Sequence, residues 1–262
     1  MPTAGNIYYT TSNLGKAGSV PLVLIHGAGG SQLGWSLHLR RLPGLNVIAL
    51  DLPGHGKSAG EGKQSLQDYA RCVADFLLDV KVFQGILVGH SLGGMIALQT
   101  TVDYPDQVLG TLVVSASAEC PIPLDIVQGL LNPLLYPGSM GWLVEGLAGG
   151  SPDRRWVEAT RRAVSQTRTG VLYGDLIACH KANLNRHLEK IKTPVWVCAG
   201  EHDRFFPTRA ARALANRIAG GRYFGIREAG HLLPLEKPEE LAEIIHRFAA
   251  ELTSGHTSTT PE

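Results

Sequence analysis

Long apolar runs and net charge are both scarce in this chain. No apolar stretch approaches the roughly 20 residues that a helix needs to span a bilayer. The N-terminal segment MPTAGNIYYTTSN has no basic part followed by an apolar run, so no secretory signal is expected. The formal net charge of +1 lacks the positive excess with which proteins capture nucleic acids. We therefore expect no membrane span and no nucleic-acid partner.

Cysteine is also scarce, and the four cysteines show no C-x-x-C or other metal-ligand spacing. They are Cys72, Cys120, Cys179 and Cys198. Isolated thiols of this kind are typical of small core residues in a reducing compartment. We expect free thiols, a cytoplasmic location, and neither a metal ion nor an organic cofactor.

The overall composition is typical of a globular protein. Of the 262 residues, 44% are hydrophobic and 18% are charged, a balance that supports a packed core and argues against disorder. The length suffices for one large α/β domain or two small ones. The 31 glycines indicate many tight turns and places where backbone segments approach each other closely.

Short apolar runs alternate with helical patterns, which is the sequence form of a parallel sheet flanked by helices. Several runs lack polar alternation, as expected for strands that are covered on both faces. The expected strands are residues 7–11, 22–25, 47–50, 86–88, 111–114, 195–199 and 223–226. The expected helices are residues 65–80, 93–104, 208–218 and 238–252. The predicted fold class is α/β, with a mostly parallel, doubly wound sheet.

The alternation stops between residues 119 and 188. This segment is helical in character, rich in Leu and Gly, and interrupted by prolines. We interpret residues 119–188 as a helical cap inserted into a core formed by residues 1–118 and 189–252, because the strand–helix pattern resumes at Val195. The polar residues 253–262 are expected to form a flexible tail.

Two segments match the pattern G-x-S-x-G, which marks a serine nucleophile in some hydrolases. They are GKSAG at residues 56–60 and GHSLG at residues 89–93. The first also looks like the end of a phosphate-binding loop. That loop requires a glycine at position 51, where this chain has Asp51, so the nucleotide interpretation fails on its spacing. A pattern this short also arises by chance, and mechanism must decide between the two serines.

A serine nucleophile of this type sits on a sharp turn between a strand and a helix, which exposes its hydroxyl. Ser91 lies between GILVGH, an expected strand, and GGMIALQTTVDY, an expected helix. Gly89 and Gly93 lack the Cβ atoms for which such a turn has no room. Ser58 has neither element beside it. We therefore predict Ser91 as the nucleophile and the segment around Ser58 as a loop that borders the pocket.

Five motifs resemble those of the α/β-hydrolase family, in the order found in that family. They are HGAGG (26–30), DLPGHGKS (51–58), GHSLGG (89–94), GEHD (200–203) and GHLLPLEKP (230–238). Only the cap and the tail fall outside them, so the resemblance covers nearly the whole chain. It implies the α/β-hydrolase fold and a serine hydrolase of the carboxylesterase type, similar to small esterases and enol-lactone hydrolases. Dehalogenases and epoxide hydrolases are disfavoured, because they carry Asp where this chain has Ser91.

A serine hydroxyl is a weak nucleophile and needs an adjacent base, itself oriented by a carboxylate. His231 lies in a loop after the last expected strand and fits the base in the family's Ser–Asp–His order. Asp203 follows the strand VWVCAG at its carboxyl end, where open sheets place functional groups, and the resemblance favours it as the acid. Glu201 and Glu119 remain alternatives for that role.

The oxyanion hole is expected from two backbone N–H groups. They belong to Leu92, directly after the nucleophile, and to Ala28, directly after the pair His26-Gly27. A donor of this kind is worth about 3–4 kcal/mol of transition-state stabilisation. Because the donors are backbone groups, the side chains at these positions need only fit.

The cap is expected to cover the acyl or aromatic group of the substrate. The predicted pocket residues are Gly27, Leu130, Leu134, Met140 and Trp142. The four apolar cap residues fit packing within the cap equally well. The cap also carries four arginines that could bind a substrate carboxylate, Arg154, Arg155, Arg161 and Arg162. Such a pattern is more typical of a solvated helix face, so an uncharged ester is favoured.

The sequence thus predicts a hydrolase that cleaves small to medium carboxylic esters through an acyl-enzyme on Ser91. Two alternatives stay open, because function lies in the pocket and not in the fold. One is a C–C bond or enol-lactone hydrolase with the same triad, and the other is a ligand-binding receptor that retains a slow triad. The expected partner is a small-molecule ester, and the expected assembly is a monomer or a homodimer.

Overall fold

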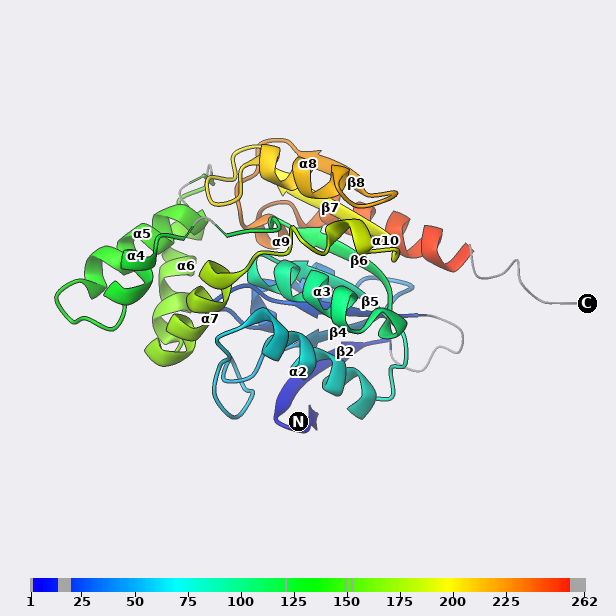
Figure 1. The fold of residues 1–262 in the computed structure, drawn as a ribbon, viewed down its shortest axis with the longest axis horizontal. Coiled ribbons are helices and arrows are strands. Elements are labelled where there is room, and N and C mark those ends of the chain that lie inside the picture. The colour runs from blue at the N-terminus through cyan, green and yellow to red at the C-terminus, as the bar shows by residue number, and fades with distance from the viewer. Residues whose placement is uncertain (1, 14–19, 121, 149, 152, 255–262) are drawn as a thin grey trace, which may run out of the picture.

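The computed structural model describes residues 2–13, 20–120, 122–148, 150, 151 and 153–254. At its centre lies an eight-stranded sheet with the order β1-β2-β4-β3-β5-β6-β7-β8 (Figure 1). The strands are β1 (Thr3–Ala4), β2 (Ile7–Ser12), β3 (Pro21–Ile25), β4 (Asn46–Leu50), β5 (Gly85–His90), β6 (Val108–Val114), β7 (Val195–Gly200) and β8 (Arg222–Ile226). β2 pairs antiparallel with both of its neighbours, β1 and β4, and the pairs from β4 through β3, β5, β6 and β7 to β8 are all parallel. The predicted mostly parallel sheet is confirmed.

The central strands are buried on both faces because their alternate side chains enter two separate hydrophobic cores. In β3, Val23 and Ile25 join one core, whereas Leu22 and Leu24 join the other. This double burial explains why the strands appear in the sequence as continuous apolar runs without polar alternation.

Helices cover both faces of the sheet. The larger core receives side chains from α2 (Leu66–Asp79), α3 (Leu92–Asp103) and α8 (Thr208–Asn216). The smaller core receives them from α1 (Leu37–Arg40), α9 (Leu233–Glu236) and α10 (Pro238–Ser254). Among the described residues, no helix is both long and apolar enough to cross a bilayer.

The last helix has the amphipathic face that its periodicity predicts. The buried residues of this face include Leu241, Ile244, Ile245, Phe248 and Leu252. α10 runs two residues further than predicted, and the hydroxyls of Thr253 and Ser254 donate to backbone carbonyls of the preceding turn. Thr253 and Ser254 therefore belong to the helix and not to a tail, and residues 255–262 lie outside the described residues.

Between β6 and β7 the described residues form four α-helices, which stand together at one end of the molecule in Figure 1. They are α4 (Leu124–Gly129), α5 (Tyr136–Ala148), α6 (Arg155–Gln166) and α7 (Thr169–Lys181). An isolated antiparallel bridge between Glu119 and Asn183 joins the entrance of this segment to its exit. We call these four helices and the described residues that join them the cap, and its boundaries at residues 119 and 188 stay a prediction.

Candidate active site

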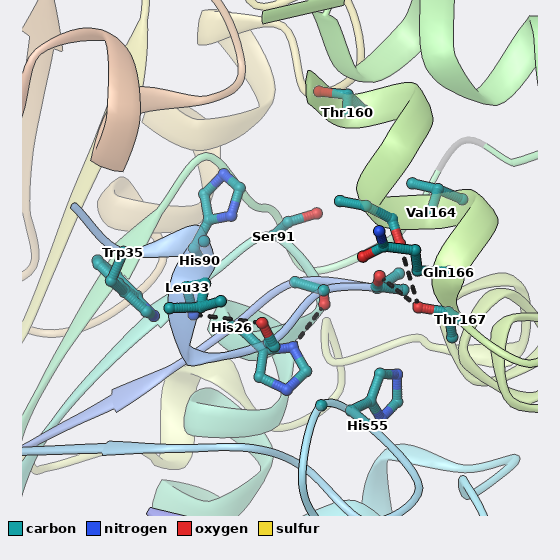
Figure 2. Close-up of a pocket in the computed structure, with 18 of the residues that line it drawn as sticks. His26, Leu33, Trp35, His55, His90, Ser91, Thr160, Val164, Gln166 and Thr167 are labelled. Carbon is teal, nitrogen blue, oxygen red and sulfur yellow. Dashed lines mark hydrogen bonds between the residues drawn. The ribbon is translucent and has the colours of Figure 1, made fainter. Parts of the chain in front are cut away.

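Ser91 occupies the sharp turn between β5 and α3. Its backbone has φ 56° and ψ −122°, a conformation that residues other than glycine rarely adopt. The N–H of Ser91 donates to the carbonyl of Val114 in the neighbouring β6 at 2.9 Å, which holds the turn against the sheet. The side chain projects from the core into a cavity that faces the cap (Figure 2). Ser91 thus has the strand–turn–helix setting that a nucleophile requires.

The two glycines that flank Ser91 are required by the close approach of backbone segments. A Cβ on Gly89 would overlap the carbonyl group of Gly93, and a Cβ on Gly93 would overlap the carbonyl oxygens of Ile25 and His26. The end of β3, the end of β5 and the start of α3 therefore meet with no space for a side chain. Any larger residue would displace the turn that presents Ser91.

Ser58, the serine of the other G-x-S-x-G match, has its hydroxyl fully engaged. The hydroxyl donates to the carbonyl of Asp51 at 2.5 Å and accepts a bond from the N–H of Tyr8 at 2.8 Å. Residues 51–65 contain neither a strand nor a helix. Ser58 therefore ties its loop to the edge of the sheet, and the loop borders the cavity as predicted.

His231 and Asp203 form a buried hydrogen-bonded pair. The Nδ1–H of His231 donates to Oδ2 of Asp203 at 3.0 Å. The other carboxylate oxygen, Oδ1, accepts the N–H groups of Phe205 at 2.9 Å and Phe206 at 2.8 Å, which fix its orientation. With the proton of the neutral ring on Nδ1, Nε2 is the basic nitrogen. Within the described residues this Nε2 is buried and has no hydrogen-bond partner.

The two alternative acids lie elsewhere. Glu201 is exposed to solvent. Glu119 is also exposed, and its Oε1 accepts a bond from the side-chain amide of Asn185 at 2.7 Å. Asp203 is therefore the carboxylate that lies beside His231.

His90, directly before Ser91, braces the loop that carries His231. Its Nε2–H donates to the backbone carbonyl of His231 at 2.8 Å. Burial, followed by the proximity of His231, lowers the pKa of His90 to about 3. His90 therefore stays neutral at physiological pH and places no positive charge beside His231.

The N–H groups of Leu92 and Ala28 are both available as donors. Leu92 is the first residue of α3, so its N–H has no intrahelical acceptor. The carbonyl of Gly27, on the same peptide as the Ala28 N–H, accepts Nδ1–H of His26 at 2.8 Å and the N–H of Gly30 at 3.1 Å. A trans peptide directs its N–H opposite to its carbonyl, so the Ala28 N–H points away from these donors.

The bond from His26 to Gly27 depends on one tautomer of the imidazole. The N–H of Leu52 donates to Nε2 of His26 at 2.9 Å, so the ring proton resides on Nδ1. Burial and the proximity of His55 lower the pKa of His26 to about 3. The neutral tautomer that orients the Gly27–Ala28 peptide therefore persists at physiological pH.

Ser91 and His231 share the wall of a cavity of about 820 Å³ between the core and the cap. Ala28 and the loop around Ser58 line it from the core, and α6 lines it from the cap. In Figure 2 the side chains of Val164 and Gln166 lie across the cavity from Ser91. The structure thus brings the three predicted catalytic side chains and the Ala28 loop to one site.

The structure corrects the predicted pocket. Gly27 lines the cavity, but Leu130, Leu134, Met140 and Trp142 do not. Leu130 and Met140 are buried in the larger core, Leu134 is 90% exposed, and Trp142 packs edge to face on an aromatic ring at a centroid distance of 5.9 Å. The prediction was wrong for these four because apolar composition alone does not distinguish residues that face a cavity from residues that pack helices together.

The cap wall of the cavity is α6 and the residues that follow it, which the sequence prediction missed. Ala159, Ala163 and Gln166 follow one another at spacings of four and three, which places them on one helix face towards the cavity. Thr160 and Val164 flank this face and are buried. Ala159 and Ala163, two small residues at helical spacing, mark this wall in the sequence, whereas large apolar residues do not.

The four cap arginines are exposed and do not line the cavity. Arg155 pairs with Asp153 at 2.6 Å, and Arg162 pairs with Glu158 at 3.2 Å. These contacts correspond to the solvated helix face and not to a carboxylate-binding site in the cavity.

Neither the cysteines nor any other group of side chains forms a metal cluster in the part of the chain that the structure describes. No three His, Cys, Asp or Glu side chains of that part gather where they could hold a metal ion. The four cysteines are free thiols. Cys179 and Cys198 are buried, as predicted for small core residues.

Comparisons with known proteins agree with this arrangement. The sequence model described as "Alpha/beta hydrolase family" matches residues 22–244, a range that includes all five motifs. A pimeloyl-[acyl-carrier protein] methyl ester esterase from Pectobacterium carotovorum subsp. carotovorum is 27% identical over 258 residues, which cover 93% of this chain and 98% of the relative.

Two solved structures illustrate the similarity of the fold. Est816, described as an N-acyl homoserine lactone degrading enzyme, superposes with a TM-score of 0.78 at 28% identity, over 92% of this chain and 96% of that one. The enol-lactonase from Burkholderia xenovorans LB400 superposes with a TM-score of 0.82 at 18% identity, over 93% of this chain and 96% of that one. At that identity the second likeness concerns the fold alone.

Proposed function

Because the chain belongs to the α/β-hydrolase family, we propose that it hydrolyses small to medium carboxylic esters through an acyl-enzyme on Ser91. The broader statement, that it is a carboxylic ester hydrolase, follows from the family and from its esterase relatives. One arrangement carries the finer proposal. A serine in a strained turn and a histidine bonded to a buried carboxylate lie in the wall of one cavity.

The proposed reaction is acyl transfer in two halves. Ser91 Oγ attacks the ester carbonyl carbon while Nε2 of His231 takes the hydroxyl proton, and Asp203 keeps Nδ1 protonated and stabilises the imidazolium. His231 then gives the proton to the leaving alcohol as the C–O bond breaks. Water repeats the same steps on the acyl-enzyme and releases the acid. The unpartnered Nε2 supports this role, because no other group in the described structure competes for its lone pair.

The negative charge that develops on the carbonyl oxygen needs donors that are already in place. We assign this role to the N–H groups of Ala28 and Leu92. The N–H of Leu92 also lies at the N-terminus of α3, where the helix dipole favours negative charge. The bonds that His26 and Gly30 make to the Gly27 carbonyl fix the peptide that carries the other donor.

The size and lining of the cavity favour a substrate with an uncharged acyl group of modest size. Its volume of about 820 Å³ lies within the roughly 300–1,000 Å³ that is usual for small-molecule sites. Leu147 and Val164 give it apolar surface, and Thr160 and Gln166 give it polar groups. Arg168 also lines it, but its guanidinium donates to the backbone carbonyl of Gly60. The substrates named for the esterase and lactone relatives both contain a carboxylic ester, open in one case and cyclic in the other. A lactone therefore belongs among the test substrates.

The test is hydrolysis of p-nitrophenyl esters from acetate to palmitate, and of an acyl homoserine lactone, by wild type, Ser91→Ala and Ser58→Ala. We expect turnover that disappears only in Ser91→Ala, with the preferred chain length set by the cavity. Stoichiometric acylation without turnover would instead indicate a receptor with a slow triad. No reaction with any ester or lactone would direct the search to C–C substrates.

Location and assembly are proposals of the same kind. We propose a cytoplasmic protein that acts on a small molecule as a monomer or homodimer. The four free thiols support a reducing compartment. Light scattering coupled to gel filtration would measure the assembly.

A further inference from the structure

Asp175, in α7 of the cap, is a fully buried carboxylate that the proposed reaction does not use. Donors from three separate parts of the core surround it. Oδ2 accepts the N–H of Gly29 at 2.8 Å and Nε2–H of His55 at 2.8 Å. Oδ1 accepts the hydroxyl of Tyr69 at 2.5 Å. A buried carboxylate is tolerated only where its charge and its lone pairs are satisfied in this way, so the network joins cap to core at a defined place.

His55 supplies the countercharge to Asp175. Its Nδ1 lies 3.1 Å from the carbonyl of Pro53, and its Nε2 lies 2.8 Å from the carboxylate of Asp175. Both neighbours are acceptors, so both ring nitrogens donate, as in an imidazolium. Burial, the largest single effect, lowers the pKa of His55, but the Asp175 carboxylate, the Pro53 carbonyl and Asp51 together outweigh it, and the pKa is raised.

Gly29 is held by the cap at both of its polar backbone groups. Its N–H donates to Asp175, and its carbonyl accepts Oγ1–H of Thr167 at 2.7 Å (Figure 2). Gly29 has φ +62°, and a Cβ there would lie 2.9 Å from Cδ1 of Leu172 in α7. The loop is thus pressed against the cap in a conformation that favours glycine.

These contacts flank the residue that presents the proposed oxyanion donor. On one side of Ala28, the Gly27 carbonyl is fixed by His26 and Gly30 of the same loop. On the other side, the N–H and the carbonyl of Gly29 are fixed from the cap. The Ala28 N–H lies between these anchors and makes no hydrogen bond within the described residues. The cap therefore supplies half of the anchors that hold this N–H in position.

We propose that Asp175 and Thr167 are positioning residues through which the cap sets the geometry of the oxyanion hole. This inference rests on the proposed function, because the oxyanion hole is part of it. Both residues act through Gly29 and not on the reacting atoms. A displacement of a catalytic group by about 1 Å can reduce a rate about 100-fold, so loss of either anchor is expected to lower kcat more than it changes KM.

The matched pair Thr167→Val and Thr167→Ser tests the anchor on the Gly29 carbonyl. Valine keeps the shape and removes the donor, whereas serine keeps the donor. With p-nitrophenyl butyrate, we expect kcat of Thr167→Val to fall about 10- to 100-fold with KM within about threefold, and Thr167→Ser to stay within about threefold of wild type.

Asp175→Asn is expected to lower kcat in the same way, because the amide keeps the volume and loses the charge that holds the Gly29 N–H. Tyr69→Phe is the control, since it removes a donor to Asp175 without touching Gly29. For Tyr69→Phe we expect a melting temperature lower by about 2–8 °C and a kcat close to that of wild type. If Asp175→Asn fails to fold, the threonine pair still decides the question.

A transition-state analogue separates positioning from general loss of structure. An alkyl trifluoromethyl ketone forms an oxyanion adduct with a catalytic serine, so its affinity depends on the oxyanion hole. We expect its affinity for Thr167→Val to fall in the same ratio as kcat/KM, with little change in melting temperature. An unchanged kcat together with an unchanged affinity in this variant would overturn the proposal.

Amide exchange of Gly29, followed by NMR in the full chain, tests the anchors without any substrate. We expect slow exchange in wild type and Tyr69→Phe, and exchange at least about tenfold faster in Asp175→Asn and Thr167→Val. If wild type shows this exchange pattern but hydrolyses no ester or lactone, the loop is held as inferred and it is the proposed function that fails. If Gly29 exchanges equally in all four proteins, the positioning role is excluded.

Discussion

Ser58 and Ser91 share one sequence pattern and have opposite surroundings. The hydroxyl of Ser58 is used twice, as a donor to Asp51 and as an acceptor from Tyr8. The hydroxyl of Ser91 makes no hydrogen bond within the described part of the chain and projects into the cavity. A reactive serine must keep its hydroxyl available, so the pattern alone says nothing until its hydrogen bonds are known.

The glycines of the two segments differ in the same sense. Gly56 and Gly89 are both required, because a Cβ would overlap the Asp51 carboxylate in the first case and the Gly93 carbonyl in the second. The last glycines of the two patterns, Gly60 and Gly93, differ in the space around them. Gly93 is enclosed by the backbone of β3, whereas a Cβ on Gly60 would meet nothing within 4 Å. Steric closure on both sides of the serine, rather than the presence of two glycines, is what marks the strained turn.

The largest expected effect is the loss of activity in Ser91→Ala. We expect kcat for p-nitrophenyl esters to fall by more than about 10,000-fold, with melting temperature close to that of wild type. Active-site titration with a p-nitrophenyl phosphonate, read by mass spectrometry, would show one covalent adduct in wild type and none in the variant. An adduct on Ser58 would reverse the comparison.

Asp203→Asn should have the next largest effect, because it alters the tautomer of His231 while leaving the cavity intact. We expect kcat to fall about 1,000- to 10,000-fold. Glu201→Gln is the matched control at the same end of β7, and its exposed side chain predicts a kcat within about twofold of wild type. Retention of a tenth of the activity in Asp203→Asn would mean that another carboxylate orients His231.

The third prediction compares the loss of stability when Gly93 or Gly60, the last glycine of each pattern, is replaced by alanine. Gly93→Ala forces a Cβ into the Ile25 and His26 carbonyls and should lower the free energy of unfolding by more than about 3 kcal/mol. Gly60→Ala meets open space and bears only the cost of its φ of +81°, about 1–2 kcal/mol. Urea denaturation of both variants measures the difference. Equal losses would show that contacts at Gly93 relax easily.

The sequence was sufficient to predict the sheet, and it also pointed to three side chains that the structure places together, because both depend on local chemistry. Apolar runs reveal strands that are buried on both faces, and the setting of Ser91 between a strand and a helix is visible in adjacent residues. Asp203 and His231 each follow a strand, and the parallel order of β7 and β8 brings the ends of these strands together. The short elements β1, α1 and α9 were missed because so few residues carry no periodicity.

The helical character of the cap was predicted, but its contacts with the core were not, because they join residues that are far apart in the sequence. Thr167 and Asp175 reach Gly29 across 138 and 146 positions, and nothing near either residue indicates that partner. The pocket prediction relied on large apolar residues in α5 and in the link before it, although Leu130 and Met140 are used in packing. Small residues on α6 leave the space that a substrate needs, and a search for large apolar side chains overlooks such space.

The fourth prediction uses His55 and His90, which lie close before the two serines and whose pKa values are shifted in opposite directions. The pKa of His90 is lowered to about 3, so its stabilising contribution is complete above about pH 6.5 and is lost as the pH falls towards 3. The pKa of His55 is raised, so its contribution is complete below about pH 6.5 and is lost as the pH rises through the raised value.

Urea denaturation between about pH 4.5 and 8.5 tests both signs. The variant His90→Asn lacks the titrating imidazole. Below pH 6.5, the slope of its unfolding free energy against pH should therefore be smaller than that of wild type, by up to about 1.4 kcal/mol per pH unit. His55→Asn should change the dependence only above pH 6.5. If the unfolding free energy of His90→Asn depended on pH below 6.5 as steeply as that of wild type, the lowered pKa of His90 would be contradicted.

The smallest effect is expected for Ser58→Ala, and it completes the comparison. Removal of the hydroxyl leaves the partly buried N–H of Tyr8 without an acceptor, so the free energy of unfolding should fall by about 1–2 kcal/mol. Since the loop borders the cavity but contributes no reacting group, kcat should stay within about threefold of wild type. Ser58→Thr keeps the hydroxyl and should restore part of the lost stability. A loss of kcat without a loss of stability would show that this loop takes part in the chemistry, and the two serines would then differ in degree and not in kind.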